Sequence, residues 1–255
     1  MHKLSVAIIT FNEEKNIERC IRSVQDIADE IVVVDSYSTD ATVEICKKLN
    51  VSCILHPFEG HIQQKNYARM LCKYDLVLSL DADEALSDTL RASIQTIKQN
   101  HTADGYTCNR LNHFCGTPVH HCGWYPDISL RLWNRNKGEW GGNNPHDKFI
   151  MHPNTTIIHL QGDILHYTVH TVEQAIAQIN SFSTISAQSK YSQGKSSSIT
   201  KIVIYPLWRF IRNYILKLGF LDGLTGFIIS KNAAYAVYLK YLKLYYMQKT
   251  NSNKQ

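Results

Sequence analysis

Short aliphatic runs alternate with segments of helical periodicity over the first hundred residues of the chain. The runs are continuous and rich in Val, Ile and Leu, which is typical of strands buried on both faces of a parallel sheet. They lie at residues 4–10, 31–34, 53–55 and 76–80. Apolar residues recur at helical spacing at about 14–24, 40–49, 61–73 and 87–99. This β-α-β-α order predicts an α/β fold with a doubly wound, mostly parallel sheet.

The alternation of strand and helix patterns ends after residue 103. Residues 104–170 hold three of the four tryptophans and most of the histidines, and short strands are expected at 129–133 and 155–160. Long loops rich in aromatic residues suit a sugar-binding surface, and a loop-rich β subdomain with ordinary core tryptophans is the alternative. We expect one domain over residues 1–190, with halves at 1–103 and 104–190.

The last part of the chain is basic and helical in pattern. The formal charge of the whole chain is +5, but residues 190–255 carry eleven Lys or Arg and one acidic residue, Asp222. We expect a helix at 172–192, a polar boundary at 192–200 and an apolar, basic helix from Pro206. On a helical wheel, polar residues share an arc of roughly 160° opposite the apolar ones. They are Lys201, Arg209, Arg212, Asn213 and Lys217.

This pattern predicts that residues 191–255 form a helical region that associates with a membrane surface through residues 201–249. The second apolar stretch, 224–239, is too short and too interrupted by Lys231 to predict a transmembrane helix. A helical pair packed on the rest of the chain is the alternative. No nucleic-acid motif is present, so nucleic acid is not an expected partner.

Cysteine usage and the first residues indicate the compartment. The seven cysteines are odd in number and contain no C-x-x-C pair, which favours a reducing compartment. Three of them, seven residues apart and close to histidines, leave zinc open as an alternative, although the spacing matches no familiar zinc pattern. The short apolar start is followed at once by polar residues and predicts no signal peptide. We therefore expect a cytoplasmic protein.

The most informative feature is the acidic segment Asp81-Ala82-Asp83-Glu84, which follows the aliphatic run at 76–80. In open α/β sheets, ligands bind just beyond the carboxyl ends of the strands. Carboxylates gathered there repel one another unless a cation or a ligand hydroxyl lies between them. A hard divalent ion that also holds substrate phosphates fits this place. An acidic turn that only begins the next helix near Ser87 is the alternative.

Polar residues also follow two other predicted strands. Thr10, Asn12 and Glu13 follow the first, and Asp35 and Ser36 follow the second. These groups could bind a base and a ribose, while the acidic segment could hold a metal on a diphosphate. Lys65, on a predicted helix, could meet a phosphate. No Walker loop and no G-x-G-x-x-G motif occurs, which disfavours nucleotide hydrolysis and dinucleotide redox chemistry.

Four ordered segments resemble the signatures of family-2 glycosyltransferases, which have the GT-A fold. They are residues 4–14, 30–42, 64–68 and 80–84. Later segments resemble the lipopolysaccharide core branch of the family, including β-1,4-glucosyltransferases. These are residues 123–127 with 131–132, 146–147, 162–167, and 206–210 with 219–223. The resemblance implies a nucleotide-sugar-binding half at 1–103 and an acceptor-binding half at 104–190.

The resemblance implies an inverting hexosyltransferase that moves a sugar from a nucleotide sugar, such as a UDP-sugar, to a lipid-linked oligosaccharide. It would work on the cytoplasmic face of a bacterial inner membrane. The nucleotide sugar would contact residues of all three strand ends and the lysine. These are Thr10, Asn12, Glu13, Asp35, Ser36, Lys65, Asp81, Ala82 and Asp83.

The resemblance also implies Mg²⁺ or Mn²⁺ on Asp83, with Asp81 on the ribose or the ion, and His166 as a further candidate ligand. Asp147 is the candidate base that takes the acceptor's proton, and Asp127 is the alternative. Asp147 stands where the branch usually has Glu, and Ser36 stands where many relatives have a second Asp.

Three other functions remain open from the sequence. A haloacid-dehalogenase-type phosphatase also places an Asp motif after an apolar strand, although normally after the first one. A polyprenyl-phosphate sugar synthase would use a lipid phosphate as acceptor and would need no general base. A membrane-docked scaffold would bind nucleotide sugar without turnover. An EF-hand is excluded because the required Gly and final Glu fall on Leu86 and Ala92.

Overall fold

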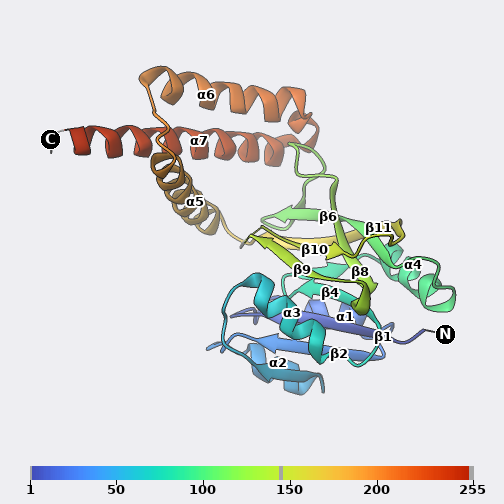
Figure 1. The fold of residues 1–255 in the computed structure, drawn as a ribbon. Coiled ribbons are helices and arrows are strands. Elements are labelled where there is room, and N and C mark those ends of the chain that lie inside the picture. The colour runs from blue at the N-terminus through green and yellow to red at the C-terminus, as the bar shows by residue number, and fades with distance from the viewer. Residues whose placement is uncertain (1, 144–145, 253–255) are drawn as a thin grey trace. The chain divides into compact units, whose positions relative to one another are not determined.

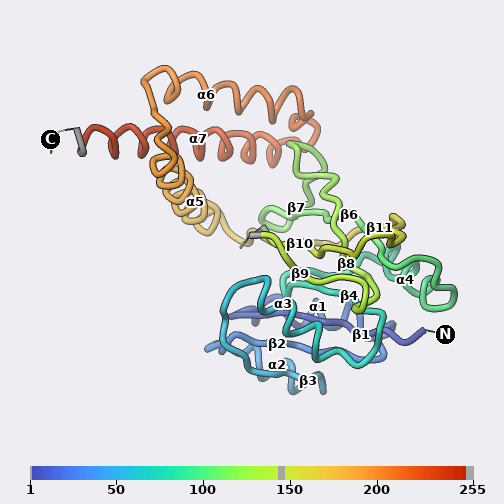
Figure 2. Tube along the Cα trace, in the orientation of Figure 1, coloured from blue at the N-terminus to red at the C-terminus, as the bar shows by residue number. Residues whose placement is uncertain are grey.

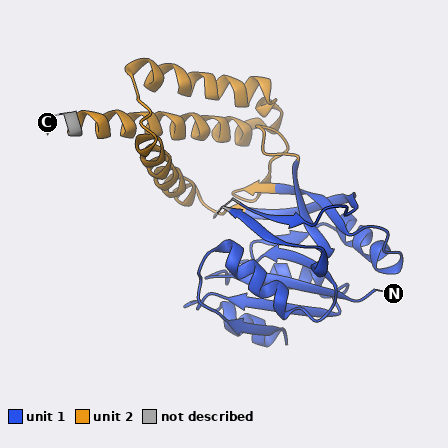
Figure 3. Cartoon of the chain, in the orientation of Figure 1, with its two compact units in different colours: residues 1–111, 127–167 blue, residues 112–126, 168–255 orange. Residues whose placement is uncertain are grey.

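The computed structural model of the chain describes residues 2–143 and 146–252, and it divides into two compact units (Figure 3). Unit 1 comprises residues 1–111 and 127–167, and unit 2 comprises residues 112–126 and 168–255. The helix at 172–192 belongs with the later helices because it packs on the last one. The functional boundary expected at residue 190 stays a prediction.

Unit 1 is built on a mixed sheet whose first half is parallel (Figures 1 and 2). Its strands are β1 (Leu4–Thr10), β2 (Glu30–Asp35), β3 (Ser52–Leu55) and β4 (Leu76–Asp81), in the order β3-β2-β1-β4. In the register, Thr10 lies beside Asp35 and Ile9 beside Asp81. The predicted α/β class and the parallel first half are therefore confirmed, and three strand ends meet at one edge.

Helices cover both faces of this parallel half. They are α1 (Ile17–Val24), α2 (Thr42–Lys48), α3 (His61–Leu71) and α4 (Asp88–Gln99). One core cluster joins alternate β1 residues, Leu4, Val6 and Ile8, to α1, α2 and α4. A second cluster joins Ala7 and its neighbours on the opposite face to α3. This two-sided burial explains why the strands read as uninterrupted aliphatic runs.

The sheet continues beyond β4 with antiparallel pairings. The strand order is β4-β8-β6-β11-β5, and the bounds are β5 (Glu84–Leu86), β6 (Gly105–Phe114), β8 (Asp127–Asn134) and β11 (Ile157–Val169). A separate pair, β9 (Gly138–Asn143) and β10 (His146–Met151), adds Trp140 and Phe149 to the second core cluster. The short helix η1 (Arg135–Lys137) joins β8 to β9. The sheet is thus parallel in its first half and antiparallel in much of its second.

Unit 2 is a set of helices with one short hairpin. Its elements are β7 (Thr117–Pro118), α5 (Val172–Ser192), α6 (Ile199–Ile211), η2 (Arg212–Leu216), η3 (Gly219–Asp222) and α7 (Gly223–Ser252). Asp222 accepts hydrogen bonds from the backbone and ring of His121, which fastens the 112–126 loop to η3. Lys243 of α7 donates to Asn180, Ser183 and Thr184 of α5. These contacts hold the unit together.

The helix expected from Pro206 begins two turns earlier than expected. Ser198 is its N-cap and accepts a hydrogen bond from the backbone N–H of Lys201, so Pro206 lies inside α6. The wheel prediction is also only partly correct. Asn213 is buried, and Phe210 and Tyr214 pack against Phe227 of α7. None of the described helices is both long and apolar enough to cross a membrane.

Asp29 fixes the start of β1 and supplies a test of the fold by pH. Its carboxylate lies 2.8 Å from Lys3 Nζ and 2.7 Å from Lys98 Nζ, and it accepts a hydrogen bond from the backbone N–H of Leu4. Burial alone would raise the pKa of Asp29, but hydrogen bonds from Lys3 and Lys98 outweigh it and hold the pKa well below its usual range.

We predict that Asp29→Asn destabilises the protein at pH 7 by about 1.5 kcal/mol, the low end for a hydrogen bond to a charged group. The folded pKa is depressed, so the stabilisation is present above the ordinary Asp pKa of about 4 and is lost as pH falls below it. Thermal melts between pH 7 and pH 2.5 measure this. Asp26→Asn is the control, because Asp26 is 52% exposed and 3.7 Å from Arg91. A stability gap that stays constant with pH would contradict the prediction.

Candidate active site

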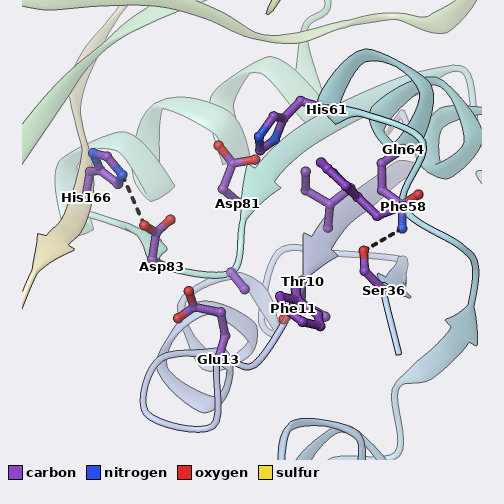
Figure 4. A pocket seen from close by; sticks show the side chains of 12 residues that line it. Thr10, Phe11, Glu13, Ser36, Phe58, His61, Gln64, Asp81, Asp83 and His166 are labelled. Atoms are coloured by element: carbon purple, nitrogen blue, oxygen red, sulfur yellow. Dashed lines mark hydrogen bonds and ion pairs between the residues drawn. The ribbon is translucent and has the colours of Figure 1, made fainter. Parts of the chain in front are cut away.

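A cavity of about 570 Å³ lies in unit 1 at the carboxyl ends of β1, β2 and β4 (Figure 4). Thr10, Ser36 and Asp81 come from the three strand ends and all line it. The close-up shows carboxylate side chains on one side of the cavity and Phe11, Phe58 and Ser36 on the other. Three strand ends predicted from sequence to converge therefore do so around one space.

The side without carboxylates offers aromatic and neutral polar groups. Phe11 and Phe58 line the cavity with 56% and 52% of their surface exposed. Ser36 Oγ accepts a hydrogen bond from Gln64 Nε2 at 3.0 Å. The buried Thr10 hydroxyl has no hydrogen-bond partner among the described residues. A polar atom left unpaired in a cavity wall is costly unless a ligand satisfies it.

Asn12 and Asp35 lie behind this wall and are not among the residues that line the cavity. Asp35 is fully buried, and its carboxylate accepts hydrogen bonds from the backbone and the hydroxyl of Ser38. Asn12 accepts from the backbone N–H of Thr39 and donates its own backbone N–H to Ser38. In this structure both residues join the loops that follow β1 and β2.

Asp81 and Glu84 share a buried cation, Arg131 of β8. Arg131 Nη2 lies 2.8 Å from Glu84 Oε1 and 3.6 Å from Asp81 Oδ2. Burial disfavours ionisation of Asp81, but the Lys65 and Arg131 cations outweigh it and hold the pKa of Asp81 well below its usual range. Burial raises the pKa of Glu84, despite the opposing effect of Arg131. The pKa of Asp81 is therefore lowered while the pKa of Glu84 is raised, and Asp81 keeps its charge.

Lys65 connects the acidic segment to Asp147. Its Nζ lies 3.1 Å from Asp81 Oδ1 and 2.8 Å from Asp147 Oδ2. Lys65 is only 5% exposed and lies 4.6 Å from the ring centroid of Trp140. The lysine predicted for a phosphate and the carboxylate predicted as base are thus direct partners. Pro145, which precedes the His146-Asp147 pair, lies outside the described residues.

Asp83 faces the cavity and contacts His166 of β11, with Asp83 Oδ2 and His166 Nε2 3.2 Å apart. Burial lowers the pKa of His166, but its hydrogen bond and charge interaction with Asp83 outweigh this, and the pKa is raised. Burial raises the pKa of Glu13, and the Asp83 carboxylate adds to that increase. Asp83, Glu13 and His166 therefore lie within electrostatic reach of one another.

These donors suit a divalent ion that brings some of its own ligands. Asp81 Oδ1 is buried and has no hydrogen bond among the described residues, and Asp83 presents its carboxylate to the same cavity. Carboxylates with an imidazole are ligands that Mn²⁺ accepts, and Mg²⁺ is usually held by one or two carboxylates together with phosphates and waters. Over the described ranges, no group of three or more His, Cys, Asp or Glu side chains is placed to hold a metal ion, and this includes Asp81, Asp83 and His166. An ion here would therefore need further ligands from phosphates or waters.

Asp127, the alternative base, pairs with Arg110 Nη2 at 2.7 Å, and Arg110 Nη1 lies 3.6 Å from Glu84 Oε1 of the acidic segment. Neither Asp127 nor Asp147 is among the residues that line the cavity. Ala82, Asp83 and Glu13 do line it, and their contact with a nucleotide sugar stays a prediction. From the sequence, no role in the site was predicted for Arg131, Phe11, Phe58 or His61, although Phe11 and Arg131 lie in segments that resemble the family. A further signal for Arg131 was its charge between the apolar residues Leu130 and Leu132 of β8.

Residues 5–155 match the sequence model of the family described as Glycosyl transferase family 2. The chain belongs to glycosyltransferase family 2. As an enzyme of this family, it transfers a sugar from a nucleotide sugar, and its α/β sheet is a GT-A-like fold. The predicted family resemblance is thereby confirmed, and the phosphatase alternative loses its basis.

Curated relatives cover almost the whole glycosyltransferase. An uncharacterized glycosyltransferase of Rickettsia typhi, RT0209, is 32% identical over 96% of this chain and 87% of its own length. The lipopolysaccharide core biosynthesis glycosyltransferase LpsC of Rhizobium meliloti is 28% identical over 95% of this chain and 92% of its own. Among solved structures, S. aureus TarS is 16% identical with a TM-score of 0.47, over 72% of this chain and 39% of the TarS chain.

We predict that Arg131→Met destabilises this glycosyltransferase by about 3–5 kcal/mol, because it removes the nearest cation of the buried Glu84 carboxyl group and one of the two cations beside Asp81. Urea unfolding followed by circular dichroism measures the change. Lys137→Met is the matched control, since Lys137 is 49% exposed and 3.8 Å from Asp104. Such an exposed pair contributes at most about 1 kcal/mol. Equal losses of unfolding free energy in the two variants would show that Arg131 does not offset the charges of Asp81 and Glu84.

Proposed function

We propose that the protein is a metal-dependent inverting hexosyltransferase that uses a UDP-sugar and a lipid-linked oligosaccharide such as the lipopolysaccharide core. The observation that carries the proposal is the shared cavity of Thr10, Ser36, Asp81 and Asp83 at three strand ends. It provides aromatic and hydroxyl groups for a nucleoside at one side and carboxylates for a metal-bound diphosphate at the other.

The nucleoside would bind against Phe11 and Phe58, whose exposed rings can stack on a base. The unpaired Thr10 hydroxyl and the Ser36 hydroxyl would hydrogen-bond its polar edge or the ribose. Asn12 and Asp35 would support this pocket from behind by fixing the loops after β1 and β2. Thr10, Glu13, Ser36 and Ala82 remain our proposed contacts to the nucleotide sugar.

Asp83 and Asp81 would hold Mg²⁺ or Mn²⁺, with His166 available as a third ligand once it is neutral. When bound, the ion would neutralise negative charge that develops on the leaving nucleoside diphosphate. Arg131 keeps Asp81 ionised for this role by placing a permanent cation behind it. Lys65 adds a second positive charge at the same carboxylate.

Asp147 would take the proton of the acceptor hydroxyl as its oxygen attacks the anomeric carbon and the bond to the diphosphate breaks. In the structure, Asp147 Oδ2 is paired with Lys65, so this oxygen is not free to accept a proton. A diphosphate entering beside Asp81 would compete for the Lys65 ammonium. Donor binding would in this way release Asp147 for proton transfer.

The acceptor assignment is supported by the name of the LpsC relative and by the surface of unit 2. Nine large hydrophobic residues of α6 and η2 are more than a third exposed: Ile199, Val203, Ile204, Tyr205, Leu207, Trp208, Ile211, Ile215 and Leu216. Arg212 and Lys217 in the same segment are also exposed. Apolar side chains beside cations suit an anionic membrane surface. We therefore propose peripheral binding at the cytoplasmic face of a bacterial inner membrane.

The donor proposal is tested by thermal melting with UDP-, GDP-, CMP- and ADP-sugars, with and without Mn²⁺. A ligand that binds only the folded state raises its stability by about 2.7 kcal/mol at a hundredfold excess over Kd. We expect only the UDP-sugar to raise the melting temperature, and only when Mn²⁺ is present. We expect Asp83→Asn to abolish this increase. Asp75→Asn, at a carboxylate that is 66% exposed, is the control. Stabilisation independent of Mn²⁺ would refute the metal role.

The base assignment is tested by Asp147→Asn. Loss of a general base lowers kcat by roughly 10²–10⁴-fold. We expect the UDP-sugar to bind at least as tightly as it binds the wild type, because the Lys65 ammonium no longer pairs with a carboxylate at position 147. Steady-state transfer assays and donor titrations measure the two effects separately. Transfer at the wild-type rate in Asp147→Asn would reject this base and would favour a lipid phosphate acceptor, which needs none.

A further inference from the structure

A second, shallow pocket of about 550 Å³ lies in unit 1 on the outer side of α1. Its floor is formed by Ala85 and Leu86 of β5 and by Leu165 and Tyr167 of β11. We call it the α1 groove. It shares no lining residue with the cavity of the active site.

The α1 groove is strongly basic. Lys15, Arg19 and Arg22 line it, against one carboxylate, Glu18. Arg22 pairs with Glu18 at 2.7 Å while its own side chain stays 61% exposed. Lys15 has no hydrogen-bond or ion-pair partner within the part of the chain that the structure describes. An excess of cations in a concave surface attracts an anionic ligand.

Arg19 is held in place at the inner end of this groove. Its guanidinium carbon lies 3.4 Å from the centroid of the Tyr167 ring, and its Nη2 donates to Asn16 Oδ1. Stacking and a side-chain hydrogen bond fix the orientation of the guanidinium before any ligand arrives, which lowers the entropy cost of binding. A fixed guanidinium is suited to bidentate contacts with phosphate oxygens.

The groove and the active site use opposite faces of β11. In the antiparallel register of β5 and β11, His166 pairs with Glu84 and Leu165 with Ala85. Successive side chains of a strand point to opposite faces. His166 therefore lines the cavity, whereas Leu165 and Tyr167 line the groove. The backbone N–H of Tyr167 also donates to the carbonyl of Asp83.

We propose that the α1 groove binds a phosphate group carried by a sugar of the acceptor. Arg19, Arg22 and Lys15 would hold the phosphate, and Leu165 with the Tyr167 ring would contact the C–H face of the sugar. The proposal rests on the proposed function, because it assigns the groove to the acceptor of that reaction. It adds a recognition site that the donor cavity does not contain.

The test uses glucose 6-phosphate as the probe, followed by ³¹P NMR line broadening with the full chain. We expect the wild type to bind it, unphosphorylated glucose to compete weakly or not at all, and UDP with Mn²⁺ to leave the affinity unchanged. Arg19→Gln/Arg22→Gln should weaken binding by at least about tenfold, as loss of charge-assisted phosphate contacts requires. Lys47→Gln/Lys48→Gln, in the last turn of α2, is the matched control.

Thermal melts and UDP binding of each variant show whether it is folded. Glucose 6-phosphate binding that survives in the folded arginine variant would overturn the proposal. Sedimentation with phosphatidylcholine and phosphatidylglycerol vesicles distinguishes the other source of phosphate. If the arginine variant lost vesicle binding but kept glucose 6-phosphate binding, the groove would be a lipid headgroup site and the proposal would be wrong. Failure of the wild type to bind any UDP-sugar would instead reject the proposed function, independently of the groove.

Discussion

The contact of Arg131 with Asp81 and Glu84 makes the acidic strand end possible. The Glu84 carboxyl group and the Arg131 guanidinium are buried at the end of β4, and the Asp81 side chain beside them is 27% exposed. Burying charges costs several kcal/mol for each ion, and only good geometry with further hydrogen bonds offsets the cost. Glu84 meets this condition, because it also accepts a hydrogen bond from the backbone N–H of Asp81. The turn that presents Asp83 to the cavity is therefore built on this ion cluster.

The cluster also separates the roles of neighbouring acidic residues. Asp81 is kept ionised by two cations, whereas the pKa of Glu84 is raised by burial. Asp83 lies outside the cluster and meets His166 instead. One short segment thus provides a carboxylate with a fixed charge, a structural carboxyl group and a carboxylate that faces the cavity beside His166. Local environment, more than residue type, assigns these roles.

Much of the parallel half could be predicted from sequence, because its signals are local. Aliphatic runs define β1, β2 and β4, and Ser87 caps α4 through the backbone N–H of Leu90, as expected. The gathering of Thr10, Ser36 and Asp83 followed from the rule that ligands bind at the ends of parallel strands. The start of α6 was missed because Pro206 looked like a first-turn proline, although Ser198 was a better cap.

Long-range partners were beyond the reach of the sequence. Nothing in the order of residues pairs Arg131 with a carboxylate fifty positions earlier, or Lys65 with Asp147. Asp35 follows a strand end, as a ligand contact would, yet its carboxylate accepts a hydrogen bond from Ser38, three residues later. Which partner a side chain takes depends on the direction of that side chain and on competition between nearby groups. One sequence specifies neither.

The two-sided use of β11 has a consequence for how this enzyme can diversify. Neighbouring side chains of the strand project to different faces. Substitutions at 165 and 167 can therefore change the α1 groove while His166 keeps its place in the cavity wall. An inserted or deleted residue in this stretch would turn the side chains that face the groove toward the cavity, and those that face the cavity toward the groove. Changes to either surface should therefore proceed by replacement at constant length, and swaps of this strand between relatives should succeed only in matching register.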